Sequence, residues 1–351
     1  MAKKLKKAAC FTDIHWGRKN NSELHNNDCM RFVEWFCENV RNDSEIDHII
    51  FLGDWFEHRS SINGLTLDYA YRGACMLEEL GLPVYFIVGN HDLYYRHTRQ
   101  VYSTNFFRSL DNFKLIGEPT VFEELGEEGA LICPYLFESE YANLTQYFNV
   151  PVWFGHFEFK GFVVTGDTRV MEHGPDPDDF KKPRRIFSGH FHKRQSGRNI
   201  QYIGNAFPAD FGDANDSSRG MMIYDYDNDS VEFKDWDECP TYIKTKLTEL
   251  TAKKAKEILK KDARVRCLVD KPISFEESTK LKEYLVDKFQ LRELYLEESS
   301  ELQEALSDTD VNVEEVEELE STDVIIRNLL EKIEAEKINN NKLIKIYEEL
   351  P

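Results

Sequence analysis

The amino-acid sequence predicts an α/β fold in which two β-sheets form a sandwich with helices on its outer faces. The first observation is that short apolar runs alternate with helical stretches across residues 1–238. Runs such as Ile49–Leu52 are apolar at successive positions, which is typical of strands buried on both faces of a sheet. The second observation is that a polar motif directly follows five of these runs. Polar residues at the carboxyl ends of strands are typical of ligand sites in α/β proteins.

The individual elements follow from apolar runs and from helical periodicity. We expect strands at Ala8–Thr12, His48–Leu52, Val84–Val88, Val152–Phe154, Arg185–Ser188 and Ile200–Ile203. We expect helices at Asp28–Val40 and Thr66–Leu80. A closing hairpin is expected to join Met221–Tyr226 to Val231–Trp236.

Four regions are predicted along the chain. Residues 1–238 form the α/β domain, and Cys239-Pro240 marks its end. Residues 239–300 are expected to alternate strand, helix, strand, helix and strand in a small α+β domain. Residues 301–320 are expected to form an acidic linker, and residues 321–351 a helical hairpin. That hairpin has too few neighbouring residues to bury its own apolar face, so it is expected to dock on a partner.

The formal net charge is −20, which argues against a protein that coats DNA on its own. The charge is unevenly placed, since Glu293 to Glu320 contains 12 acidic residues and no basic one. A basic cluster at 181–198 flanks one of the polar motifs. No apolar run approaches the roughly 20 residues of a membrane span. The seven cysteines are scattered without a CxxC pair, which predicts a reducing cytoplasm, that of a host cell if the gene is carried by a phage.

The five polar motifs contain carboxylate, amide and imidazole side chains. In order they are Asp13-Ile14-His15, Gly53-Asp54, Gly89-Asn90-His91-Asp92, Gly155-His156 and Gly189-His190-Phe191-His192. Residues i and i+2 of an extended segment point the same way, so both side chains of each DxH or HxH pair can reach the same metal site. The preceding glycines allow sharp turns and a close approach of the backbone.

This set of side chains predicts two divalent metal ions. Mixed nitrogen and oxygen ligands suit Mn²⁺, Fe or Zn²⁺ better than Mg²⁺ or Ca²⁺. We expect Mn²⁺, with Mg²⁺, Zn²⁺ and Fe as alternatives. Two divalent ions carry four positive charges, and two aspartates contribute two negative charges. The site therefore keeps a net positive charge, which favours binding of an anionic phosphate ester.

Each motif alone has a plainer interpretation. Asp13 can be a turn residue, Asn90 a loop residue and His156 a satisfied core histidine. Five such motifs, each at the end of an expected strand, make purely structural roles a poor explanation of the set. The remaining histidines, His25, His48, His97 and His173, are expected to be structural or exposed.

These residues resemble the calcineurin-like metallophosphoesterase superfamily, and within it the SbcD-type nucleases of double-strand-break repair, including those of T-even-like phages. The resemblance is carried by the five motifs and by stretches such as Phe154–Glu158 and Tyr202–Asn205. It is strongest over residues 9–225. It implies a DNA nuclease of the double-strand exonuclease and single-strand endonuclease type, working in DNA recombination, repair and replication. In this family plan, residues 239–300 are a capping domain that helps to hold DNA.

The resemblance also implies a role for each motif residue. The first metal would be held by Asp13, His15 and His192, the second by Asn90, His156 and His190, and Asp54 would bridge both. His91 would stabilise the transition state or protonate the leaving oxygen, with a structural role as the alternative. Asp92 would orient His91 through a hydrogen bond.

One position departs from the family pattern. Many relatives have a histidine three residues after the bridging aspartate, where this chain has Glu57 followed by His58. Either His58 substitutes, or the positioning of the DNA strand is weaker, since Glu57 would repel phosphates. Lys193 and Arg194, beside the last motif, are further DNA-positioning candidates.

The resemblance implies partners as well. These are DNA, an SMC-like ATPase of the SbcC type bound through the C-terminal helices, and a second copy of the chain. The homodimer would use helices near Thr66–Leu80 and Ser103–Leu110, whose aromatics can equally be core. Two other functions stay open: a phosphatase or phosphodiesterase acting on a non-DNA phosphate ester, and a scaffold with a degenerate site. The complete ligand set speaks against the scaffold.

Overall fold

The computed structural model of the chain describes residues 3–165, 169–251 and 253–298, which belong to one compact unit. The acidic linker and the helical hairpin expected at 301–320 and 321–351 lie outside the described residues. Within the described residues, no helix is long and apolar enough to cross a membrane.

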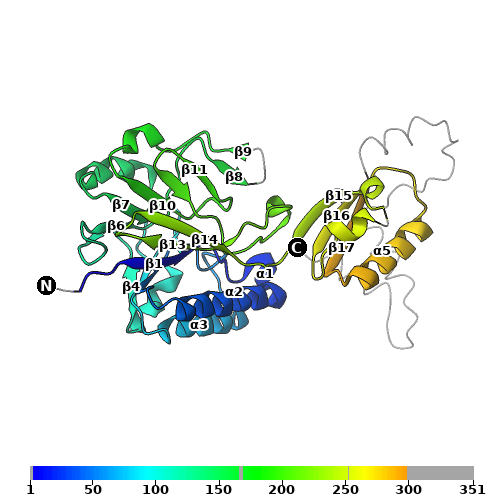
Figure 1. Cartoon of the computed structure of the whole chain (residues 1–351), viewed down its shortest axis with the longest axis horizontal. Helices are drawn as coiled ribbons and strands as arrows, with labels where there is room; N and C mark the ends of the chain where they lie inside the picture. The colour runs from blue at the N-terminus through cyan, green and yellow to red at the C-terminus, as the bar shows by residue number, and fades with distance from the viewer. Residues whose placement is uncertain (1–2, 166–168, 252, 299–351) are drawn as a thin grey trace, which may run out of the picture. The chain divides into compact units, whose positions relative to one another are not determined.

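Two six-stranded sheets form the sandwich that the sequence predicts (Figure 1). The first has the order β14-β13-β1-β2-β3-β4 and the second the order β11-β12-β10-β7-β6-β5. The strands of the first sheet are β1 (Lys7–Phe11), β2 (His48–Phe51), β3 (Val84–Ile87), β4 (Phe113–Ile116), β13 (Gly220–Asp225) and β14 (Ser230–Asp235). Those of the second are β5 (Thr120–Phe122), β6 (Ala130–Cys133), β7 (Val152–Gly155), β10 (Arg185–Ser188), β11 (Gln195–Gly197) and β12 (Ile200–Tyr202). The predicted fold class is confirmed.

The parallel strands explain where the site can form. In the first sheet β1, β2, β3 and β4 run parallel, and in the second β6, β7, β10 and β12 do. In these two sheets, the antiparallel pairs are β1 with β13, β13 with β14, β5 with β6 and β11 with β12. The polar motifs therefore follow strands that end together within each sheet.

Alternation along the strands divides the core into layers. In β1, Ala8 and Cys10 face the space between the two sheets, whereas Ala9 and Phe11 pack under the helices. The inner layer joins residues of both sheets, such as Ile50 and Phe154. Because both faces of a strand are buried, its residues are apolar at every position, which is why the strand pattern was readable in the sequence.

Two long helices cover the outer face of the first sheet, as Figure 1 shows in blue. Helix α2 (Glu23–Asn42) begins five residues before the predicted start, because the Ser22 side chain accepts the His25 amide and caps it. Helix α3 (Gly64–Glu78) begins after Asn63, whose side chain accepts the amide of Thr66 at 2.7 Å. Both helices were expected, but these caps were overlooked.

The other elements are short. They include α1 (Arg18–Asn21), β8 (Val163–Thr165) and β9 (Arg169–Val170). The 3₁₀ helices are η1 (Ser103–Ser109), η2 (Glu138–Tyr147), η3 (Pro177–Phe180), η4 (Phe211–Asp213) and η5 (Leu247–Glu249). Strands β4, β5, β6 and β11 of the two sheets were not predicted from the sequence. The segment expected as a dimer helix at Ser103–Leu110 is the 3₁₀ helix η1, and its Phe107 is a core residue.

The segment after Cys239 has the expected order of elements. These are β15 (Tyr242–Lys246), α4 (Lys254–Ile258), β16 (Arg264–Val269), α5 (Phe275–Phe289) and β17 (Glu293–Glu298). The three strands make one parallel sheet in the order β15-β16-β17.

A buried carboxylate ties this small sheet to helix α2. Asp28 lies 2.7 Å from Arg292 Nη1 and 3.7 Å from Arg264 Nη2, and the Asp28 and Arg264 side chains are each only 3% exposed. Buried ion pairs are costly to break, because the remaining charge is left without a partner.

We therefore expect Asp28→Ala to lower the free energy of unfolding by about 3 kcal/mol. Alanine is a better helix former than aspartate, so helix propensity cannot cause the loss. Urea denaturation followed by circular dichroism measures it. The control is Asp68→Ala, whose pair with Arg72 is well exposed, and which should change stability by less than about 0.5 kcal/mol. Equal losses in the two variants would contradict the buried tie.

Candidate metal centre

The polar motifs lie where parallel strands end. Asp13 and His15 follow β1, Asp54 follows β2 and Asn90 follows β3 in the first sheet. From the second sheet, His156 follows β7, and His190 with His192 follows β10. The site therefore bridges the ends of both sheets, and it depends on the sandwich rather than on any one strand.

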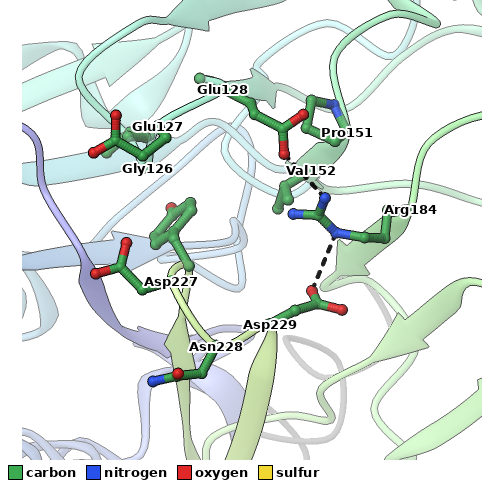
Figure 2. Close-up of a pocket in the computed structure, with 12 residues that line it drawn as sticks. Gly126, Glu127, Glu128, Pro151, Val152, Arg184, Asp227, Asn228 and Asp229 are labelled. Carbon is green, nitrogen blue, oxygen red and sulfur yellow. Dashed lines mark hydrogen bonds and ion pairs between the residues drawn. The ribbon is translucent and has the colours of Figure 1, made fainter.

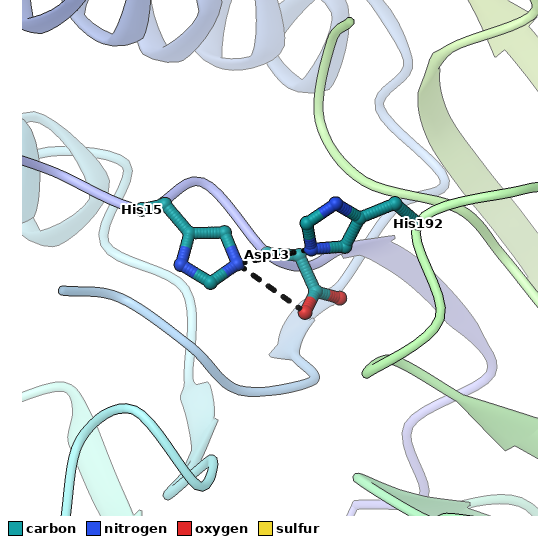
Figure 3. Close-up of side chains that lie close together, drawn as sticks. All are labelled: Asp13, His15 and His192. Carbon is teal, nitrogen blue, oxygen red and sulfur yellow. Dashed lines mark hydrogen bonds and ion pairs between the residues drawn. The ribbon is translucent and has the colours of Figure 1, made fainter. Parts of the chain in front are cut away.

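The first cluster comprises Asp13, His15 and His192, whose ligand atoms all lie within 4.8 Å of one another. Figure 3 shows the two rings turned toward the carboxylate and toward each other. His15 Nε2 lies 3.2 Å from His192 Nε2 and 3.8 Å from Asp13 Oδ1. Two ring nitrogens and a carboxylate oxygen thus point at one small volume.

The second cluster comprises Asp54, His156 and His190. His156 Nε2 lies 3.3 Å from Asp54 Oδ2 and 3.3 Å from His190 Nδ1. The side-chain oxygen of Asn90 completes this group, 2.9 Å from His156 Nε2 and 3.0 Å from His190 Nδ1.

Asp54 joins the two clusters. Its Oδ2 lies 3.8 Å from His15 Nε2 in the first cluster and 3.3 Å from His156 Nε2 in the second. The amide of His190 also donates to Asp13 Oδ2 at 3.0 Å, so the two motifs are tied through the backbone as well. All seven side chains that the sequence proposed as ligands lie in this one centre.

The donor set fits divalent metal ions. Two pairs of imidazole nitrogens approach within about the length of a hydrogen bond, and each pair can share only one proton. The opposite nitrogen of His156 is engaged, since its Nδ1–H donates to the Leu52 carbonyl at 2.7 Å. This fixes the tautomer that turns the Nε2 lone pair toward the cluster. A cation between the two nitrogens of each pair would accept a lone pair from both of them.

Backbone strain concentrates at the same residues. Asp13, His15, Asp54 and His190 have φ angles of 52°, 53°, 61° and 86°, in the left-handed region. Such conformations are uncommon outside glycine and cost of order 1 kcal/mol or more each. The folded chain therefore holds four of the seven candidate ligands in unfavourable conformations, a pattern typical of functional sites.

Two glycines make room for the centre. A Cβ on Gly53, where φ is 104°, would lie 2.5 Å from His156 Nδ1. A Cβ on Gly89 would lie 2.2 Å from Asp54 Oδ1. These close approaches explain the glycine that precedes each ligand in the two motifs.

The electrostatics favour a positive charge in the centre. Burial raises the pKa of Asp13, and the nearby Asp54 raises it further. Burial lowers the pKa of His156, but the carboxylates of Asp54 and Asp13 outweigh it and raise that pKa to about 9. A positive charge is therefore favoured at His156 Nε2, where a metal ion would lie. Burial lowers the pKa of His15, His190 and His192, which favours the neutral form that binds metals.

His91 lies beside the centre. Its amide donates to Asp54 Oδ1 at 2.7 Å, and its ring meets that of His15 edge-on at 4.9 Å. Its Nδ1 lies 2.7 Å from the carbonyl oxygen of Glu57. A carbonyl only accepts, so Nδ1 carries the hydrogen, and Nε2 is the nitrogen that can take up a second proton and then deliver it from the imidazolium form.

The expected hydrogen bond from Asp92 to His91 was wrong. The fully buried carboxylate of Asp92 instead accepts the amides of Gly89, Asp54, Trp55 and Phe56 at 3.0 to 3.2 Å. Burial and the charge of Asp54 raise the pKa of Asp92 to about 7, against the effect of the amides of Gly89 and Phe56. Asp92 thus holds the turns after β2 and β3, and the Glu57 carbonyl holds His91.

The Glu57 carboxylate is paired with His15 and Arg18 rather than isolated, which corrects the expectation of an unbalanced repelling charge. Its Oε2 lies 2.9 Å from His15 Nδ1 and 3.8 Å from Arg18 Nη1. Burial opposes ionisation, but His15 and Arg18 lower the pKa of Glu57 well below its usual value. His58, the alternative to the histidine that many relatives have at position 57, is half-buried.

The two basic residues proposed to position DNA, Lys193 and Arg194, differ in their contacts. Arg194 Nη1 lies 2.7 Å from Asp235, and its guanidinium lies 4.1 Å from the ring centroid of Phe233. This packing against β14 does not favour contact with DNA. Lys193 follows the ligand His192 and is half-buried, and its role stays a prediction.

Sequence reasoning missed Glu158 and Tyr135 around the ligands, and it expected His25 only as a structural or exposed histidine. Glu158 Oε2 lies 3.9 Å from His190 Nε2, and Tyr135 donates to the same oxygen at 3.2 Å. His25 Nε2–H donates to the carbonyl of His15 at 3.0 Å, and burial lowers the pKa of His25 to about 3. Glu158 follows His156 by two residues on one side of an extended segment, which is a usable signal. Tyr135 and His25 carry no signal in the sequence.

A separate surface pocket of about 470 Å³ is lined by Arg184, Glu128 and Asp229, among others (Figure 2). Arg184 Nη1 lies 3.0 Å from Glu128, and its Nε lies 3.4 Å from Asp229. It lies where β7 begins, at Val152, and none of the candidate ligands lines it. Its single cation is neutralised, so it offers no comparable chemistry.

Comparisons with known proteins agree with this geometry. Residues 6–194 match the family described as calcineurin-like phosphoesterase. The chain is 30% identical over 187 residues to exonuclease subunit 1 of Enterobacteria phage T4, an alignment that covers 52% of this chain and 53% of that protein. The chain thus spans about half the length of this curated relative.

Two solved structures resemble the chain weakly. A dimetal phosphatase from Danio rerio is 10% identical with a TM-score of 0.39, covering 64% of this chain and 93% of that one. The nuclease MPE of Pseudomonas putida is 15% identical with a TM-score of 0.31, covering 63% and 85%. The family match itself covers more than half of the 351 residues and contains all seven candidate ligands. The chain therefore belongs to the calcineurin-like phosphoesterase family of metal-dependent hydrolases.

Proposed function

We propose that the chain is a two-metal DNA nuclease that hydrolyses phosphodiester bonds, as a double-strand exonuclease and single-strand endonuclease. The observation that carries this proposal is the pair of ligand clusters joined by Asp54 at the ends of both sheets. The choice of DNA is supported by the 30% identity to a protein named as an exonuclease subunit.

The ligand assignment follows the two clusters. Asp13, His15 and His192 would hold the first ion, Asn90, His156 and His190 would hold the second, and Asp54, which lies near both clusters, would contribute to both sites. When bound, two such ions neutralise charge on the phosphate and make a water molecule more acidic. Histidine nitrogens among the ligands favour Mn²⁺ over Mg²⁺.

The chain's own residues complete the reaction. His91 delivers a proton to the leaving oxygen from Nε2, because its Nδ1 is held by the Glu57 carbonyl. Asp92 keeps the Asp54 turn in place through three amides of that turn. Neither of these two contacts depends on metal binding.

The net charge of −20 supports a partner's share in DNA binding. Neutralisation of phosphates supplies most non-specific affinity for DNA, so an acidic nuclease binds weakly alone. We propose that an SMC-like ATPase of the SbcC type, docked on residues 321–351, supplies the missing basic surface in DNA end processing and recombination. We also propose a homodimer that covers exposed apolar side chains of α3 and η1, such as Tyr71 and Phe106. The reducing cytoplasm suits the seven free cysteines.

A substrate comparison tests the function. Purified full-length chain with Mn²⁺ is incubated with linear duplex DNA, closed circular single-stranded DNA and p-nitrophenyl phosphate. We expect Mn²⁺-dependent cleavage of both DNAs, increased by an SbcC-type ATPase and ATP. Hydrolysis of p-nitrophenyl phosphate with both DNAs left intact, with or without the ATPase, would assign the centre to a phosphatase instead.

We expect Asp54→Asn to lower DNA cleavage by at least about 100-fold, because it removes the charge shared by both clusters. The Mn²⁺ content, measured by elemental analysis after desalting, should fall from two ions per chain. Asp237→Asn, at an exposed position after β14, is the control and should match the unmodified protein. Two retained ions in Asp54→Asn would refute the bridging role.

We expect His91→Ala to retain both ions while cleavage falls by about 10² to 10⁴-fold, the usual contribution of general acid catalysis. The same metal analysis and a gel assay measure the two effects. His97→Ala, an exposed histidine six residues along the chain, is the matched control. Loss of metal in His91→Ala would mean that His91 is a ligand rather than an acid.

A further inference from the structure

Glu57 contacts the metal centre through two different atoms. Its side-chain Oε2 lies 2.9 Å from His15 Nδ1, and its main-chain oxygen lies 2.7 Å from His91 Nδ1. His15 belongs to the first ligand cluster, and His91 is the proposed acid. One residue therefore holds two imidazoles that have different tasks.

The side-chain contact decides how His15 presents its other nitrogen. His15 Nε2 faces Asp13, Asp54 and His192 at 3.2 to 3.8 Å. Nδ1 is then the outward nitrogen, and the Glu57 carboxylate beside it is an ion-pair partner whose alignment falls outside that of a hydrogen bond. Its negative charge favours the hydrogen on Nδ1 and the lone pair on Nε2. Such a carboxylate fixes the ring and increases its basicity, and its loss typically costs about 10 to 100-fold in metal affinity.

The position of Glu57 is fixed independently of the metal. Its amide donates to the Trp16 carbonyl at 3.0 Å, and the preceding amides of Trp55 and Phe56 donate to Asp92. Arg18 Nη1 lies 3.8 Å from the carboxylate, and Arg18 is itself held by Asp210 at 2.6 Å. The Glu57 side chain is 22% exposed, so water competes little for these contacts.

The second cluster has a looser counterpart. Glu158 Oε2 lies 3.9 Å from His190 Nε2, beyond hydrogen-bond distance, and accepts a bond from Tyr135 instead. The Glu158 side chain is also more exposed, at 32%. The two metal sites are therefore supported unequally by the carboxylates behind their histidines.

We propose that Glu57 is a positioning residue with two separable parts. Its carboxylate orients His15 and sets the affinity of the first metal site, and its carbonyl orients His91 for proton delivery. This rests on the proposed two-metal function. It assigns a role to the position where the chain departs from the histidine of many relatives. Substitutions of the side chain remove only the first part, because the carbonyl remains.

The test is Mn²⁺ binding to the full-length chain by isothermal titration calorimetry, with Glu57→Gln, Glu57→Ala and Glu158→Gln compared. We expect Glu57→Gln to weaken one of two sites by about 10-fold and Glu57→Ala by about 100-fold, with the other site unchanged. Glutamine retains an acceptor for His15 without the charge, so it should rescue part of the loss. Glu158→Gln should change affinity less than about 3-fold, since its contact is longer.

A cleavage assay over a range of Mn²⁺ concentrations separates the two parts of the role. For Glu57→Gln we expect the Mn²⁺ concentration for half-maximal rate to rise about 10-fold, while the maximal rate falls less than about 3-fold. Thermal unfolding of the metal-free variant reports any general loss of folding. Unchanged Mn²⁺ affinity in both Glu57 variants would overturn the inference. Equal losses at Glu57 and Glu158 would do so too.

The outcomes also separate this inference from the proposed nuclease function. The calorimetric result needs no nucleic acid, so it stands if the unmodified chain binds Mn²⁺ but leaves DNA intact. In that case the nuclease proposal fails and the role of Glu57 at the metal site remains. If DNA is cleaved but Mn²⁺ affinity ignores Glu57, the nuclease proposal remains and this inference fails.

Discussion

The centre depends on one buried carboxylate that binds no metal. Asp92 accepts four backbone amides from the turns after β2 and β3, and it is completely buried. A carboxylate that satisfies several amides can hold a turn that would otherwise expose unpaired donors. The turn carries Asp54 in a left-handed conformation between the two clusters, and it leads directly to Glu57. Hydrogen bonding within the fold therefore offsets the strain at the ligands.

Charge within the molecule is arranged on two scales. At short range, buried carboxylates and imidazoles face one another closely, and the carboxylates of Asp54 and Asp13 raise the pKa of His156 to about 9, which favours a positive charge in the centre. At long range, the chain carries a net charge of −20, which repels a polyanion. A centre that attracts phosphate inside a chain that repels DNA is consistent with our proposal that a partner presents the substrate.

The sequence allowed most of the sandwich to be predicted, because buried parallel strands leave continuous apolar runs such as Ile49–Leu52. It failed for β4, β5, β6 and β11, and for the first turn of α2, where the cap Ser22 was overlooked. Four of the seven candidate ligands were predicted from spacing, since DxH and HxH place alternate side chains on one side of an extended segment, and the other three from their places at strand ends. The residues that hydrogen-bond or pair with the site side chains were predicted less well, as Asp92 and Glu57 show.

The sequence by itself determined the kinds of donor atom, their order along the chain and their places at strand ends, because these depend only on local pattern. The tertiary structure alone decided which atoms support them. Whether Asp92 would reach His91 or the amides of a neighbouring turn depends on how β2 and β3 lie side by side. Likewise, Glu57 could repel phosphate or hold His15, and only the packing of the turn after β2 against that after β1 turned it inward. Contacts between segments distant in sequence leave no periodic trace, so they could not be read in advance.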